Sequence, residues 1–258
     1  NQRIDTTKIR LLSLAAALCL GTATSGQALE LNKGDHVVLI GNALAERMQH
    51  HGWLESYIQA TMADKELVIR NHGFGGDKVN NRPRNNGFPS ADTYLEISKT
   101  DVILAFWGYN ESFDNSPDAY RADLTKWIDE TNGKKYNDKG APTIVLFSPI
   151  AHENLGQANL PDGSANNERL AKYAEVTRQV ANEKGVEFVD LFDLSQDLNE
   201  RSKLPLTING IHLTSKGNNQ LARGIHKSLF GKSPRVSGRK LARIRDAVLD
   251  KNWHWYNR

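Results

Sequence analysis

The sequence lacks the features that mark several protein classes. Its 258 residues include one cysteine, so no disulfide can form within the chain. It has no uninterrupted apolar run of about 20 residues, which a membrane-spanning helix needs. The 20 glycines and 8 prolines are too few for a collagen-like or low-complexity chain. The charge is nearly balanced at +3, so the composition favours a globular domain without a nucleic-acid partner.

The N-terminal segment has the pattern of a secretory signal peptide. Basic residues precede the apolar run Leu11–Leu20, and small residues at 26–28 follow as a cleavage site. We therefore expect residues 1–28 to be cleaved, no membrane span to remain, and the protein to be exported to the periplasm or the extracellular space. A retained anchor is the alternative. Cys19 would be removed with the signal, which suits an oxidising compartment.

Five short runs rich in Val, Ile and Leu alternate with stretches of helical periodicity. This alternation predicts a parallel sheet covered by helices on both faces, a three-layer α/β/α sandwich. In such sheets ligands bind beyond the carboxyl ends of the strands. The expected strands are His36–Gly41, Leu67–Asn71, Val102–Trp107, Thr143–Ser148 and Val186–Asp190, and the expected helices are Ala43–Thr61, Ala91–Ser98, Pro117–Thr131, Asn166–Glu183 and Ser215–Leu229.

The C-terminal segment differs in charge from the rest of the chain. Residues 235–258 hold seven Lys and Arg against two Asp and Glu. We therefore divide the mature chain into a domain at 29–232 and a basic helix or linker at 233–258 that leads into a further domain. A nucleic-acid patch on this segment is a less favoured alternative.

Four loops that follow predicted strands or precede the last helix carry a recurring set of residues. Gly41-Asn42-Ala43 follows the first strand, and a glycine-rich loop at 72–78 follows the second. Gly108-Tyr109-Asn110-Glu111 follows the third strand, and residues 207–213 precede the last helix. Together these loops resemble the four sequence blocks of the SGNH (GDSL-type) hydrolase family over roughly residues 34–230. The resemblance implies a flavodoxin-like fold with a five-stranded parallel sheet.

The resemblance also implies roles for particular positions. The family's nucleophilic serine matches Ala43, and a shift by one residue to Asn42 provides only an amide, which is a poor nucleophile. Gly76 and Asn110 match the two donors of the oxyanion hole. His212 matches the base, and Asn209 occupies the position of the acid. The base and oxyanion donors are thus kept, while the nucleophile is lost.

The residues that match the base and the oxyanion donors are compatible with two functions. His212 can take a proton from water, and two donors at one oxyanion lower the barrier to ester hydrolysis. The first hypothesis is an esterase or deacetylase that acts on a small-molecule ester or glycan without a cofactor or metal. Because Ala43 and Asn209 are inert, the second is an inactive domain that binds carbohydrate or another ligand. An electron-transfer protein of flavodoxin type is disfavoured, since the loops match a hydrolase.

Other polar residues at the same edge are candidates for substrate binding. They are Asp77, Tyr109, Glu111, His152 and Glu153. Asp77 paired with a glutamate would instead permit glycoside hydrolysis. A metal site from His152, Glu153 and His212 is disfavoured, because the spacing matches no standard zinc motif. Arginines that could hold an anionic sugar or a carboxylate are Arg47, Arg82 and Arg84.

Overall fold

Five parallel strands form a single sheet. The computed structural model describes residues 28–83 and 87–257. The strand order is β2-β1-β3-β4-β5, with every neighbouring pair parallel. The predicted α/β fold with a five-stranded parallel sheet is therefore confirmed. The strands are β1 (His36–Gly41), β2 (Val68–Asn71), β3 (Val102–Phe106), β4 (Thr143–Phe147) and β5 (Glu187–Val189).

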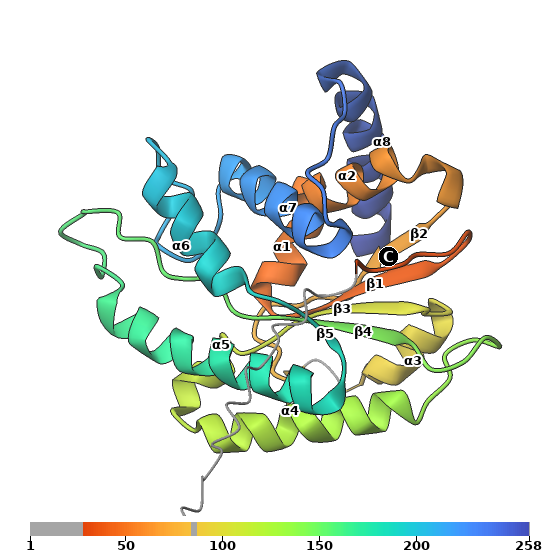
Figure 1. The fold of residues 1–258 in the computed structure, drawn as a ribbon, viewed down its shortest axis with the longest axis horizontal. Coiled ribbons are helices and arrows are strands. Elements are labelled where there is room, and N and C mark those ends of the chain that lie inside the picture. The colour runs from red at the N-terminus through yellow and green to blue at the C-terminus, as the bar shows by residue number, and fades with distance from the viewer. Residues whose placement is uncertain (1–27, 84–86, 258) are drawn as a thin grey trace, which may run out of the picture.

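Helices cover both faces of the sheet, as Figure 1 shows. Alternate residues of a strand point to opposite faces, so Leu104 and Phe106 enter one core cluster while Ile103 and Ala105 enter the other. One layer contains α1 (Ala43–His51), α2 (Trp53–Thr61), α6 (Leu191–Arg201), α7 (Ser215–Phe230) and α8 (Gly238–Tyr256), and the other contains α3 (Ala91–Ile97), α4 (Pro117–Asn132) and α5 (Ser164–Lys184).

The single helix expected at Ala43–Thr61 is two helices. Gly52 separates them with a φ of 66°, a left-handed conformation that ends α1. A Cβ atom at this position would lie 3.1 Å from the Leu249 side chain of α8. The break therefore gives α1 and α2 different directions and lets α8 pack closely over the junction.

Helix α8 covers the edge strand of the sheet. Its Lys251 Nζ and Trp255 Nε1 donate hydrogen bonds of 2.8 Å each to the carbonyl oxygens of Ile69 and Asn71. Both acceptors belong to β2, whose open edge would otherwise be available to another strand. Whether the segment 233–258 leads into a further domain stays a prediction.

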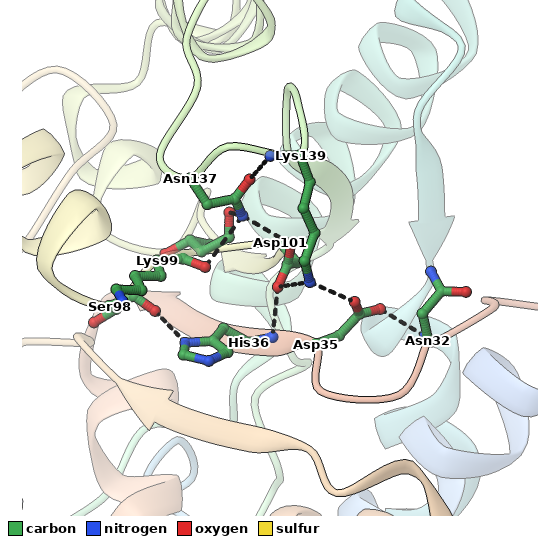
Figure 2. A network of polar contacts seen from close by, with 9 residues as sticks. Asn32, Asp35, His36, Ser98, Lys99, Asp101, Asn137 and Lys139 are labelled. Carbon is green, nitrogen blue, oxygen red and sulfur yellow. Dashed lines mark hydrogen bonds and ion pairs between the residues drawn. The ribbon is translucent and has the colours of Figure 1, made fainter.

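A polar network ties the amino ends of β1 and β3 together, on the side of the sheet opposite to the functional loops (Figure 2). Asp101 Oδ2 accepts the His36 N–H at 2.8 Å, and Asp101 Oδ1 accepts from Asn137 Nδ2 at 2.7 Å. Lys139 Nζ lies 3.1 Å from Asp101 and 3.4 Å from Asp35. These contacts align the two central strands and so support their carboxyl ends.

The predicted signal peptide falls, apart from Ala28, outside the residues that the structure describes. Within the described ranges, no helix combines the length and the apolar character that crossing a membrane requires.

Candidate active site

The turn after β1 brings Ala43 to the carboxyl edge of the sheet. Gly41 has a φ of 134°, and a Cβ there would lie 2.2 Å from the carbonyl oxygen of Phe106, so only glycine fits. Asn42 is buried, and its Oδ1 accepts the Leu44 N–H at 3.1 Å, which caps helix α1. Ala43 is therefore the first residue of α1, and its match to the family's serine position stays a prediction.

A mostly apolar cavity opens beside Ala43. Its volume is about 40 Å³, and because one water needs roughly 10–15 Å³ on this measure, it admits a few waters or a small acyl group. His212 from the loop before α7 and Tyr109 from the loop after β3 reach the same cavity. The lining residues are Asn42, Ala43, Leu44, Arg47, Phe106, Trp107, Tyr109, Ser148, Pro149, Ile150, Ile211, His212, Leu213 and Asn218.

His212 is oriented by Asn209. The imidazole Nδ1 lies 3.1 Å from Asn209 Oδ1, and the same oxygen accepts the backbone N–H of His212 at 3.0 Å. An amide oxygen accepts hydrogen bonds, so this contact fits a proton on Nδ1 and leaves Nε2 as the acceptor. Asn209 thus orients the ring as a carboxylate would, without a negative charge.

The surroundings of His212 favour the neutral imidazole. Burial is the largest cause that lowers the pKa of His212, and the Arg47 guanidinium lowers it further. The Glu46 carboxylate opposes both effects. A His212 with a lowered pKa is mostly neutral at pH 7 and can accept a proton, although the imidazolium that results has no carboxylate to stabilise it.

Gly76 and Asn110 are joined through Asp77 rather than through the cavity. Asn110 Nδ2 donates to the Asp77 carbonyl oxygen at 2.9 Å, which fixes the loop after β3 against the loop after β2. Gly76 has a φ of 90°, and a Cβ there would meet no atom within 4 Å. Neither residue lines the cavity, although Tyr109, the neighbour of Asn110, does. A shared oxyanion hole from these two donors stays a prediction.

The structure gives Glu111 a supporting role. Its buried carboxylate accepts the N–H groups of Val79 at 2.8 Å and Gly108 at 2.9 Å, one from each functional loop. Burial raises the pKa of Glu111, while these backbone hydrogen bonds oppose the rise. Asp77 lines a separate cavity with Arg82. Neither carboxylate lines the cavity beside Ala43, so glycoside hydrolysis in that cavity gains no support from this geometry.

Glu153 and His152 shape the loop that carries Asn209 and His212. The buried Glu153 carboxylate accepts the Leu206 and Thr207 N–H groups and the Thr207 hydroxyl at 2.6–3.0 Å. His152 packs beneath the same loop, where a Cβ on Gly210 would lie 2.1 Å from its Nε2. Both side chains act behind the site and do not line the cavity.

His152, Glu153 and His212 do not form a cluster of ligands. The described ranges 28–83 and 87–257 contain no group of three or more His, Cys, Asp or Glu side chains that could hold an ion. In particular, hydrogen bonds to residues 206 and 207 occupy the Glu153 oxygens, which the alternative metal site would have used.

Of the three candidate arginines, the structure shows which one lines the cavity. Arg47 lines the cavity, whereas Arg82 lies over the Trp107 ring at 5.2 Å, and Arg84 falls outside the described residues. The sequence analysis did not select Ser148 as a candidate, although it lines the cavity. Its position at the carboxyl end of a strand was the available signal.

Comparisons with known proteins agree with this architecture. The chain resembles an acetylxylan esterase from Geobacillus stearothermophilus at 18% identity and a TM-score of 0.62, covering 81% of this chain and 100% of that one. Another solved structure of that esterase is a catalytic mutant in which alanine replaces a serine. An alpha/beta hydrolase from the metagenome of Lake Arreo, Spain, is 17% identical with a TM-score of 0.60, covering 77% of this chain and 96% of that one. No curated protein sequence matches.

The family model adds evidence from the sequence itself. The GDSL-like lipase/acylhydrolase model matches residues 40–220, which begin just before the β1 turn and extend beyond His212. The matched range covers more than half of the chain and includes Ala43, Gly76, Asn110 and His212. This chain therefore belongs to the GDSL-like lipase/acylhydrolase family.

Proposed function

We propose that the domain hydrolyses a short-chain acyl ester of a small molecule or a carbohydrate, outside the cytoplasm. The observation that carries the proposal is the His212–Asn209 pair, which holds a neutral base in the cavity that Ala43 lines. The small apolar cavity suits an acyl group such as acetyl. The esterase activity of structural neighbours and the signal-like N-terminus support the substrate class and the location.

The proposed reaction uses water as the nucleophile. Water beside the Ala43 methyl group attacks the ester carbonyl carbon while His212 Nε2 takes one of its protons. The carbonyl electron pair moves to oxygen at the edge of the cavity, and the proposal assigns this oxyanion to the Gly76 N–H and to the Asn110 amide N–H that the Asp77 carbonyl oxygen does not use. Collapse of this intermediate breaks the bond to the alcohol oxygen, which receives the proton from Nε2. The products are one carboxylic acid and one alcohol.

The expected rate is modest. A triad without its nucleophile retains roughly 10³–10⁴-fold acceleration over water, through the oxyanion hole and substrate binding. Turnover on this scale is measurable on an activated aryl ester and slower on a natural one.

A binding function without turnover is the second candidate, and Ser148 favours it. Its Oγ donates to Asp190 Oδ1 at 3.1 Å and accepts the Leu191 N–H at 2.7 Å, so its hydroxyl serves the chain after β5. Burial raises the pKa of Tyr109, so its phenol stays protonated at neutral pH. Neither cavity hydroxyl is therefore prepared to replace the missing serine.

The two candidates differ in the effect of two substitutions. Wild type, His212→Ala, Ala43→Ser and the control Ala242→Ser, on the exposed side of α8, would be purified identically. Each would be assayed with 4-nitrophenyl acetate and acetylated xylooligosaccharides. Wild-type turnover that His212→Ala abolishes and the control retains supports hydrolysis. Turnover in Ala43→Ser alone supports a binding domain, and silence in all four contradicts hydrolysis of these esters.

A further inference from the structure

We propose that Arg47 binds an anionic group of the ligand and that the domain selects esters or related molecules that carry a carboxylate. This inference rests on the proposed function, because it names the substrate class of the same cavity.

Arg47 lies on the same helix as Ala43, the residue that matches the nucleophile position. It lies four residues after Ala43 on α1, so both side chains share one face of the helix, about 6 Å apart along its axis. Both residues line the cavity that His212 also reaches. A ligand whose ester group lies at Ala43 and His212 therefore extends toward Arg47 within the length of one small ring.

Among the residues that the structure describes, no hydrogen bond or ion pair holds the Nε atom of Arg47, which is buried. In the described part of the chain, hydrogen bonds or aromatic rings engage other arginines: Arg169 donates to Ser112 and Asn166, and Arg245 donates to the His51 carbonyl oxygen and lies over Trp53. A partly buried arginine without such partners is costly to keep, unless a ligand supplies the acceptor.

The charge around the cavity favours an anion. No aspartate or glutamate is among the lining residues. Glu46, the carboxylate next to Arg47 in the chain, is 3.5 Å from His50 Nε2. The positive charge of Arg47 also contributes to the lowered pKa of both His51 and His212. A carboxylate is the anion that fits best, because its two oxygens match the paired donors of one guanidinium.

The test compares two molecules that differ only in charge. The probes are 4-hydroxybenzoate and its neutral isostere 4-hydroxybenzamide, which are the alcohol products of the corresponding acetate esters. Their binding would be measured by calorimetry on wild type, Arg47→Gln, Arg47→Lys and the control Arg243→Gln, whose side chain is exposed on α8. The acetate esters would be assayed for turnover in parallel.

We expect wild type and Arg243→Gln to bind the carboxylate at least tenfold more tightly than the amide. Arg47→Gln should abolish this preference, and Arg47→Lys should retain part of it, since it keeps the charge and loses the paired donors. Equal binding of both probes, absence of binding by either, or a preference that survives in Arg47→Gln would overturn the inference. An Arg47-dependent preference without ester turnover would uphold the inference and contradict only the proposed hydrolysis.

Discussion

The Nδ1 atom of His212 lies 3.1 Å from the side-chain oxygen of Asn209, in a pair that provides orientation without charge. A carboxylate in the place of Asn209 would fix the same tautomer and would also stabilise the imidazolium that forms when the base accepts a proton. Asn209 thus orients His212, while the negative charge that a carboxylate would add is absent.

Restoring that charge should improve the base. In the Ala43→Ser background, Asn209→Asp is expected to raise kcat for an aryl acetate by at least tenfold, toward the factor of about 10⁴ that separates amide from carboxylate in a well-studied triad. Steady-state kinetics would measure the change. The matched control is Asn132→Asp at the exposed end of α4, which should leave kcat unchanged. An unchanged kcat in the Asn209→Asp protein would show that His212 is not the base.

The pH dependence of kcat/KM should reflect the lowered pKa of His212. Because burial and Arg47 lower the pKa of His212, kcat/KM of wild type should rise through a pKa below the usual histidine range and be level at neutral pH. Arg47→Gln removes a nearby positive charge, so the acid limb should move to higher pH. Profiles between pH 4 and 8, with Arg243→Gln as control, measure the shift. A limb that stays in place or moves to lower pH would contradict this account.

Glu153 should contribute mainly to the stability of the fold and only indirectly to turnover. Glu153→Gln replaces one acceptor oxygen by an NH₂ group that faces the backbone donors of Leu206 and Thr207, so we expect a loss of about 1–3 kcal/mol in the free energy of unfolding. Urea unfolding would measure it, with the exposed Glu168→Gln as control. Any turnover should fall through kcat, because the His212 loop loosens. Unchanged stability would mean that these hydrogen bonds contribute little.

The packing of helix α8 should contribute to the stability of the domain. Trp255 donates to the Asn71 carbonyl oxygen and its ring stacks on His72 at 5.7 Å, whereas Trp253 on the same helix is 63% exposed. Trp255→Ala is expected to cost about 2 kcal/mol in the free energy of unfolding, less than the ~3–5 kcal/mol of a core tryptophan. Trp253→Ala should change it by less than about 0.5 kcal/mol. Equal effects of the two changes in thermal and urea unfolding would refute the packing role of α8.

The local sequence was enough to predict the sheet and the order of the functional loops. Runs such as the one that forms β3 are apolar at every position, which is typical of strands buried on both faces by helices. The resemblance to family motifs next to those strands led us to expect Ala43 and His212 at one site, and both residues line the same cavity, while their roles stay predictions. The break between α1 and α2 at Gly52 could not be predicted, since a single glycine inside a helical pattern does not reveal whether another helix packs against it.

The roles of Glu111 and Glu153 were decided only by the tertiary structure. From the sequence, both were candidates to touch substrate, yet each accepts hydrogen bonds from backbone groups distant in the chain, Val79 at 32 positions from Glu111 and Leu206 at 53 from Glu153. Side-chain identity reports what a carboxylate can do, but its partners depend on which loops the fold brings together. The sequence by itself showed that arginines capable of binding an anion were present. Only the position of Arg47 on the turn of α1 that faces the cavity distinguished it from the others.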